Sequence, residues 1–119
     1  MSPSSRDLPA TELAATLDWR GECAVLSVAG EIDLLSAPEF EEVVGSVLAG
    51  RPEVLVVDLR GVTFFCSAGL QVLAAAHRKL AERALRVVSD SPVTSGPLTT
   101  TGLDTWIGVH PTVDEALRT

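Results

Sequence analysis

The sequence predicts an α/β fold, with a mixed sheet of about four or five strands and about four helices packed on it. Aliphatic runs alternate along the chain with segments of helical periodicity, which is typical of parallel strands joined by crossover helices. The first two strand-like segments are too close together for a crossover, so they predict an antiparallel hairpin. The chain has 119 residues, 46% of them hydrophobic, which is enough for the core of one domain.

The hairpin is predicted from residues 12–19, ELAATLDW, and residues 23–30, CAVLSVAG. In the second segment Ala24, Leu26 and Val28 alternate with the residues between them, as in a partly buried strand. The short Arg20-Gly21-Glu22 link fits a hairpin turn.

A first helix is predicted after the segment GEIDLLSAPEF. Ser36 and Glu39 have capping-box spacing, and Pro38 lies in the first turn. Gly50 is placed to end this helix. One apolar stripe recurs at helical spacing along it, formed by Phe40, Val43, Val44, Val47 and Leu48.

Residues 53–59, EVLVVDL, are almost continuously aliphatic and predict a central strand that is buried on both faces. The segment CSAG follows after a short interval and leads into a second helix. The apolar stripe of this helix is formed by Leu70, Leu73, Ala74, His77, Leu80 and Ala81.

The last third of the chain continues the alternation. Residues 84–89 and 105–110 predict two further strands. Between them, Ser91-Pro92 predicts a helix start, and Gly96-Pro97 predicts an interruption of that helix. Residues 111–119 predict a closing helix that opens with a second capping box.

The composition of the chain limits the possible binding partners and the expected cellular location of the protein. Residues 1–10 are rich in serine and proline and predict a disordered tail, which leaves residues 11–119 as the domain. The net charge of −7 argues against nucleic acid as a partner. The amino terminus lacks the apolar core of a signal peptide, and no apolar run approaches the ~20 residues of a membrane helix. We therefore expect a cytoplasmic protein that does not interact with membranes.

The residues indicate no catalytic site, metal site or cofactor. The two cysteines, Cys23 and Cys66, lack metal-ligand spacing and are expected to be reduced and half-buried, with a regulatory disulfide as the alternative. Ser67 does not lie in a nucleophile elbow, and no phosphate loop with its lysine is present. A small hydrolase that uses Ser67 or Cys66 needs a histidine within reach. His77 lies on the apolar stripe of the second helix. His110 precedes a proline, in a connection that is expected to be exposed.

Two carboxylates, Asp33 and Asp58, each follow or end a strand. One interpretation is that both accept backbone N–H groups in turns. The other is that both lie on the same sheet edge as Ser67.

Three segments carry a pattern that extends over most of the chain. In order they are GEIDLLSAPEF, VLVVDLRGVTFFCSAGLQVLAAAHRKL and TTTGLDTWIGVHPTVDEAL. This order resembles that of the anti-sigma factor antagonists of bacteria, in the STAS domain family. The family pattern runs G-E-L-D, a helix opened by proline, D-L-S-G-V, F-x-D-S-S-G-L and T-G-L-D, and it ends in a helix. The resemblance covers about residues 12–118 in one register.

The resemblance implies a non-enzymatic switch. Such proteins bind an anti-sigma factor that is also a serine kinase, and binding releases a sigma factor. The kinase phosphorylates the second serine of D-S-S-G, which ends the binding, and a phosphatase removes the phosphate again. A phosphate adds a charge of about −1.5 to −2 at this helix start.

Carried over residue by residue, the resemblance assigns Asp33 and residues 66–69 to the partner surface. Gly69 matches the motif glycine, and Ser67 matches the first serine, placed to cap the second helix. Ala68 stands in the place of the phosphorylated serine, and Cys66 in that of the aspartate. Alanine has no hydroxyl to accept a phosphate.

Three hypotheses follow. The protein is an antagonist that is always able to bind its anti-sigma kinase. Alternatively, regulation has moved to Ser67, to Thr63 or to oxidation of Cys66, whose thiol lies near a helix N-terminus. In the third hypothesis the protein is a STAS scaffold or a small-ligand or nucleotide-binding module outside sigma-factor control. The sequence leaves the oligomeric state open.

Overall fold

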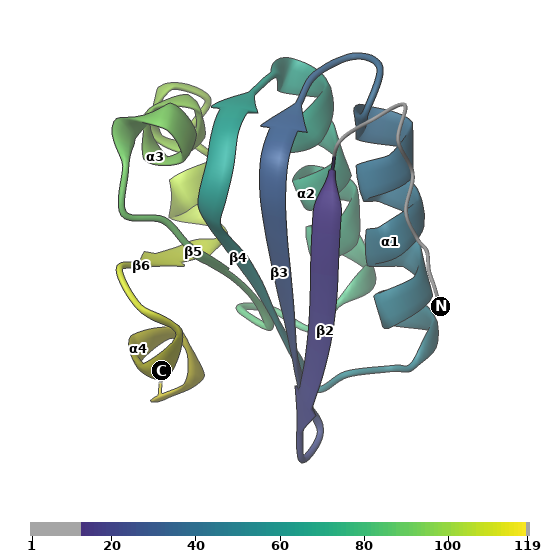
Figure 1. Cartoon of the computed structure of the whole chain (residues 1–119). Coiled ribbons are helices and arrows are strands. Elements are labelled where there is room, and N and C mark those ends of the chain that lie inside the picture. Colours follow the sequence, from purple (N-terminus) through teal and green to yellow (C-terminus); the bar gives the residue numbers. More distant parts are fainter. Residues whose placement is uncertain (1–12, 119) are drawn as a thin grey trace.

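A computed structural model describes residues 13–118, and they form a five-stranded sheet with helices on both faces (Figure 1). The predicted α/β fold, with a mixed sheet and four helices, is confirmed; the predicted tail, residues 1–10, lies outside the described residues. The elements in chain order are β2 (Ala14–Arg20), β3 (Cys23–Ile32), α1 (Ala37–Ala49), β4 (Val54–Phe65), α2 (Ser67–Lys79), β5 (Leu85–Val88), α3 (Pro92–Thr100), the 3-10 helix η1 (Leu103–Thr105), β6 (Gly108–His110) and α4 (Val113–Arg118).

The strand order is β2-β3-β4-β5-β6, which is also the order along the chain. Strand β2 pairs antiparallel with β3 through the predicted hairpin, and the other neighbours are parallel. Strand β4 is central as predicted, and Leu55, Val56 and Val57 in it are fully buried. It runs on to Phe65, past the predicted end, because two register shifts let it stay paired with β3.

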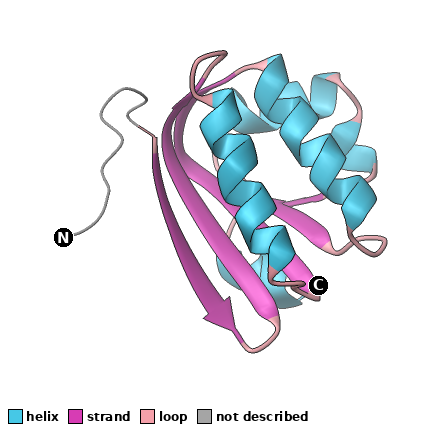
Figure 2. Cartoon of the chain, turned by 90° about the vertical axis from the view of Figure 1, so that its right-hand side faces the viewer, coloured by secondary structure: helices cyan, strands magenta, loops and turns pink. Residues whose placement is uncertain are grey.

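Helices α1 and α2 lie side by side over one face of the sheet (Figures 1 and 2). The main core on this face also includes α3 through Leu98, together with Phe40, Leu26, Val57 and Leu73. Helix α4 covers part of the opposite face, where Ala116 packs against Val25, Val56 and Val88. Within residues 13–118, no helix has the length and the apolar composition needed to cross a membrane.

The predicted interruption of α3 at Gly96-Pro97 is wrong. The helix runs through Pro97, and its start is secured by Ser91, whose hydroxyl oxygen accepts the Val93 N–H at 3.2 Å. A proline inside a helix leaves the carbonyl four residues earlier without its usual donor. That carbonyl belongs to Val93, a residue in the first turn of the helix that is 40% exposed.

The predicted face of α2 is rotated in the structure. Leu70 and Leu73 are buried as expected, but Val72 and Ala76 complete the buried face, whereas Ala74 and His77 are only half-buried. The helix also ends at Lys79, before Leu80 and Ala81. The sequence pattern missed this rotation because alanines occupy both faces and give little contrast between them.

Candidate functional site

The residues assigned by the resemblance meet at the carboxyl-terminal edge of the sheet, at the top of Figure 1. Strands β3 and β4 end side by side there, since Ile32 pairs with Phe65 and the Cys66 N–H donates to the Ile32 carbonyl at 3.0 Å. Asp33 follows β3 directly, and residues 66–69 form the start of α2. Parallel strands and their crossover helices bring these two segments together.

Asp33 shapes the loop between β3 and α1. Its Oδ1 accepts the backbone N–H groups of Leu35 and Ser36, each at 3.0 Å. These hydrogen bonds, the one from Ser36 first, hold the pKa of Asp33 below its ordinary value although burial opposes them. Asp33 therefore acts as a turn-forming residue, as one of the two interpretations predicted.

Ser36 secures the same loop, but not through the predicted capping box. It lies at the N-cap of α1 without a side-chain capping bond. Its hydroxyl instead donates to the Glu31 carbonyl at 2.6 Å and accepts the Asp33 N–H at 2.9 Å. The prediction failed because the chain turns back at Asp33 and engages the hydroxyl there.

This loop presents two leucines to solvent. Leu34 and Leu35 are 77% and 83% exposed, and Phe64, near the end of β4, is 51% exposed. No motif or periodicity in the sequence assigns these three residues to a partner surface. The available signal was that the two leucines fit neither the strand alternation before them nor the helical stripe after them.

A groove between α1 and α2 continues from this edge, with a volume of about 410 Å³. Leu34, Pro38 and Glu41 line one side of it, and Ala68, Gln71 and Arg78 line the other. Ala68, the residue in the family's phosphorylation position, is thus half-buried beside an exposed leucine. We refer to Leu34, Leu35, Phe64, Ala68 and this groove as the docking surface.

Helix α2 begins one residue earlier than expected. Cys66 is the N-cap, with an extended backbone and no side-chain capping bond, and its carbonyl accepts the Gly69 and Leu70 N–H groups at 3.0 and 3.3 Å. The prediction that Ser67 caps the helix is therefore wrong. Ser67 is the first helical residue, and its side chain is exposed.

Gly69 faces inward. A Cβ atom at this position would lie 2.7 Å from Cε1 of Phe65 and 2.9 Å from Cγ2 of Ile32. A glycine is required here because α2 starts in close contact with the ends of β3 and β4. Gly69 thus allows the helix that carries Ala68 and Ser67 to pack closely against the sheet.

The structure places neither histidine near the two residues that a hydrolase would use. His77 follows Ser67 by ten residues on the same helix, which is about 15 Å at the rise of an α-helix. His110 lies at the end of the edge strand β6 and is half-buried, so the expectation that it is exposed is wrong. Neither imidazole can reach the hydroxyl of Ser67 or the thiol of Cys66.

Both cysteines are free and half-buried, as predicted. Cys23 begins β3, and the Cys66 N–H donates to the carbonyl of Ile32, which ends the same strand nine residues after Cys23. This span is about 30 Å in a strand, far beyond the reach of a disulfide within one chain. Among the described residues, no group of three or more His, Cys, Asp or Glu is arranged to hold a metal ion.

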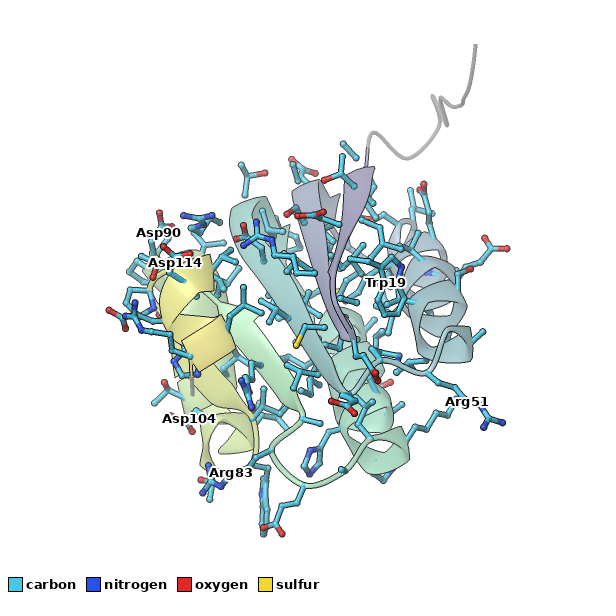
Figure 3. The ribbon with its side chains drawn as sticks, turned by 90° about the horizontal axis from the view of Figure 1, so that it is seen from below. Trp19, Arg51, Arg83, Asp90, Asp104 and Asp114 are labelled. Atoms are coloured by element: carbon cyan, nitrogen blue, oxygen red, sulfur yellow. The ribbon has the colours of Figure 1, made fainter. Side chains whose placement is uncertain are left out.

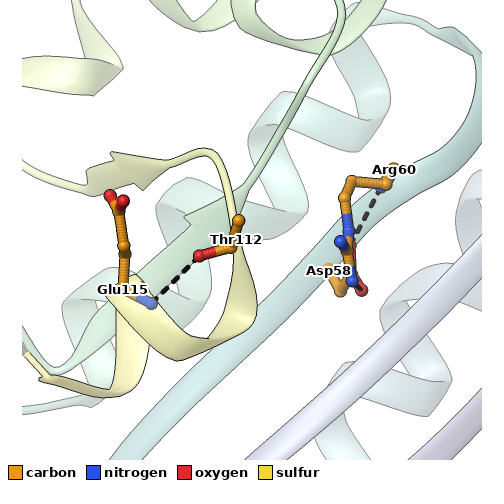
Figure 4. A network of polar contacts seen from close by, with 4 residues as sticks. All are labelled: Asp58, Arg60, Thr112 and Glu115. Carbon is orange, nitrogen blue, oxygen red and sulfur yellow. Dashed lines mark hydrogen bonds and ion pairs between the residues drawn. The ribbon is translucent and has the colours of Figure 1, made fainter.

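Asp58 lies away from the docking surface, because it pairs with Ser27 and Val88 in the middle of the sheet. The interpretation that it shares an edge with Ser67 is wrong. Its Oδ1 accepts the backbone N–H and the Nε–H of Arg60 at 3.1 and 3.0 Å, and its Oδ2 accepts from Nη2 at 2.8 Å (Figure 4). Burial alone would raise the pKa of Asp58, but the hydrogen bonds and charge of Arg60 outweigh it and lower that pKa.

Figure 4 also shows the start of α4, where the Thr112 hydroxyl oxygen accepts the Glu115 N–H at 3.1 Å. This bond is the one that the second capping box predicts for its threonine.

Known proteins are similar to this chain in sequence and in fold. The family described as "Mlab, STAS domain" matches residues 15–111. The anti-sigma-F factor antagonist RsfB of Mycobacterium tuberculosis is 42% identical over 95 residues, which are 79% of this chain and 78% of that protein.

Two solved structures extend the comparison. A crystal structure of an anti-sigma factor antagonist from Mycobacterium paratuberculosis is 38% identical, with a TM-score of 0.86 over 95% of this chain and 97% of that chain. The unphosphorylated form of the Bacillus anti-sigma factor antagonist SpoIIAA is 20% identical and shares the fold, with a TM-score of 0.68 over 87% of this chain and 93% of that one. The resemblance predicted from the motifs is confirmed: the chain belongs to the STAS domain family.

Proposed function

We propose that this protein is an anti-sigma factor antagonist that binds an anti-sigma factor kinase through the docking surface and so promotes release of a sigma factor. It acts in the cytoplasm by binding and carries out no catalysis of its own. The observation that carries the proposal is the exposed Leu34, which lines one groove with Ala68, together with the exposed Leu35 and Phe64 at the same edge of the sheet, on a STAS domain whose 42% identical relative is named an anti-sigma-F factor antagonist.

The docking surface has the chemistry of a protein interface. Large apolar side chains that are exposed at one edge of the sheet favour burial by a partner. The loop that presents Leu34 and Leu35 is held by the bonds to Asp33 and Ser36, so little conformational entropy is lost on binding. Acidic residues such as Glu41 and Glu42 lie exposed on the adjacent helix and suit a partner with basic residues at its rim.

The residue at position 68 decides whether phosphorylation at the family's usual position can regulate partner binding. A phosphate at this position would bring about two negative charges beside Leu34 in the groove and oppose burial of that leucine. Alanine keeps the groove small and uncharged, so the protein stays competent to bind. Ser67 is the second candidate for a phosphorylation site, because its hydroxyl is exposed and caps no helix. Thr63 is also exposed, but on β4.

The test combines binding with mass measurement. The full chain is incubated with each anti-sigma kinase encoded in the source genome, with and without ATP. We expect one kinase to form a complex that size-exclusion chromatography resolves, and the mass of the wild-type chain to stay unchanged with ATP. Ala68→Ser should bind in the same way and then gain one phosphate and dissociate.

Two other results would change the proposal. A wild-type chain that gains a phosphate, but not after Ser67→Ala, would move the regulation to Ser67. Failure to bind any such kinase would overturn the partner assignment and favour a scaffold or ligand-binding role outside sigma-factor control.

A further inference from the structure

Strand β2 forms one edge of the sheet and is exposed along its whole length (Figure 1). Within residues 13–118 it pairs with a strand on one side only, whereas the strand at the other edge, β6, has just three residues. Natural sheets protect a long edge with a bulge, a proline or a lysine. Strand β2 contains neither proline nor lysine and pairs with β3 in one unbroken register, so its outer side is open to a further strand.

The outer side of β2 presents a regular row of backbone groups. Two residues form the turn between Arg20 and Cys23, so this pair exchanges both of its backbone hydrogen bonds. Hydrogen-bonded pairs alternate along an antiparallel ladder. Ala15, Leu17 and Trp19 therefore turn their N–H and C=O groups away from β3, toward any strand that is added.

Two large apolar side chains lie along this edge. Leu17 and Trp19 are 46% and 42% exposed, whereas the β3 residues that pair with them, Leu26 and Ala24, are buried. Figure 3 shows Trp19 between β2 and α1. The indole ring lies close to the end of α1, because a Cβ atom on Gly50 would be 2.9 Å from its Cζ2. An aromatic side chain that is held in place and still half exposed favours burial by a partner.

The order of residues in β2 fits a second copy of the same strand. The strand opens with two alanines and closes with its two largest side chains, in the order Ala-Ala-Thr-Leu-Asp-Trp-Arg. When two copies pair antiparallel about a twofold axis at Leu17, each alanine lies opposite one of these large side chains. Ala15 faces Trp19 of the second copy, and Ala14 faces Arg20.

Charge favours the same register. About this axis Asp18 lies opposite Thr16 of the second copy, whereas an axis at Asp18 would place two carboxylates directly opposite each other. An axis at Thr16 would leave Trp19 and Arg20 beyond the paired residues. Asp18 and Arg20 also cancel in charge, so β2 is neutral on a chain with a net charge of −7. A second copy is therefore repelled less at this edge than elsewhere.

The face of the sheet opposite α1 has room for Arg20 of the second copy. A hollow of about 200 Å³ lies beside β2, and its lining includes Ala14, Thr16, Ser27 and Ala29. Ala14 is the residue that Arg20 of the second copy faces in this register. The hydroxyl groups of the hollow can accept N–H groups from a guanidinium.

We propose that β2 pairs antiparallel with β2 of a second copy of this chain, about a twofold axis at Leu17, to form a homodimer in which the two sheets are continuous. The docking surface lies at the carboxyl ends of β3 and β4 and on α1 and α2, and it shares no residue with β2. The dimer therefore does not depend on the proposed partner.

Sedimentation equilibrium of the full chain tests the proposal. The mean mass should rise with concentration from that of one chain toward that of two. Leu17→Lys should weaken the dimer at least tenfold, because it places two like charges at the axis. Val93→Lys is the matched control, because Val93 is an exposed apolar residue on α3, and it should leave the dimer unchanged.

Two results of this measurement would overturn the proposal. One is a chain that stays monomeric up to about 1 mM, since a Kd above this value reflects no specific contact. The other is a dimer that Leu17→Lys leaves intact, since the interface would then lie elsewhere.

A pair of substitutions tests the register. Thr16→Asp should weaken the dimer at least fivefold, because it places a carboxylate opposite each Asp18. Addition of Asp18→Thr should restore the dimer, because a threonine then faces each carboxylate again. Both positions are exposed, so the variants should fold normally, which thermal melts check. Failure of the second substitution to restore the dimer would overturn the proposed pairing.

Discussion

Asp33 holds Leu35 in its exposed position, because its carboxylate oxygen accepts the Leu35 N–H at 3.0 Å. The carboxylate that the family resemblance assigns to partner contact is thus engaged within its own loop. Asp33 can thus contribute to partner binding in two ways. Its charge can contact the partner, or its hydrogen bonds can keep the loop in the conformation that exposes Leu35.

Asp33→Asn should therefore preserve partner binding within about threefold, because an amide oxygen can accept the same N–H groups. Asp33→Ala should weaken binding at least tenfold, or about 1.4 kcal/mol, because the loop loses its turn. Isothermal titration calorimetry with the anti-sigma kinase measures both. If Asn and Ala weaken binding equally, the charge of Asp33 contacts the partner directly.

Leu35→Ser should reduce binding at least tenfold without lowering the free energy of unfolding, since this side chain is 83% exposed. Val93→Ser is the matched control, because Val93 is an exposed apolar residue on α3, outside the docking surface. Equal effects of the two substitutions would place the interface elsewhere.

Ala68→Asp should weaken binding at least tenfold, because a carboxylate in the groove would lose water without gaining a partner. Ala68 is half-buried at the exposed end of α2, so the fold should tolerate the change. An acidic residue in the first turn also interacts favourably with the helix dipole. Unchanged affinity, measured by calorimetry on a variant with a normal melting temperature, would show that the partner does not reach the groove.

Gly69→Ala should destabilise the protein by about 1–3 kcal/mol, because the added methyl group meets Phe65 and Ile32 at less than 3 Å. Gly96→Ala is the counterpart inside α3, where a Cβ atom meets nothing within 4 Å. It should stabilise the protein by up to about 1 kcal/mol. Urea unfolding measures both changes, and a neutral Gly69→Ala would mean that α2 can shift away from the sheet.

Asp58→Asn should cost about 1–3 kcal/mol of unfolding free energy at pH 7, because charged hydrogen bonds to Arg60 are lost. The pKa of Asp58 is lowered in the folded state, so its contribution is complete above the unfolded carboxyl pKa and is lost as the pH falls through the folded value. The stability difference from wild type should accordingly shrink below about pH 4.

Asp18→Asn is the control for this titration. Asp18 and Arg20 form an exposed pair, with 62% and 50% of their side-chain surfaces accessible, and such pairs contribute little. A loss at Asp18 as large as that at Asp58 would show that burial of Asp58 is not what strengthens its pair.

Local patterns in the sequence were enough to predict the five strands and four α-helices of the described residues in their order. They did not predict η1, and the last strand begins at Gly108 rather than at residue 105. The continuous aliphatic run 53–59 marked the central strand, and the short link at Gly21 marked the hairpin. The docking surface was predicted only in part. Its segments were identified by the order of the motifs, but Leu34, Leu35 and Phe64 were not, because periodicity indicates which residues are buried and says little of those that a loop exposes.

The sequence by itself determined the α/β class, the STAS family and the loss of a hydroxyl at position 68, because these depend on residue identity and spacing along the chain. Only the tertiary structure decided that Asp33 and Ser36 form hydrogen bonds within their own loop, and that Ser67 is exposed while Cys66 takes the N-cap position of α2. The physical reason is that a polar side chain in a loop has several possible partners nearby in the sequence, and the path that the backbone takes between the paired strand β3 and the packed helix α1 decides which of them it meets.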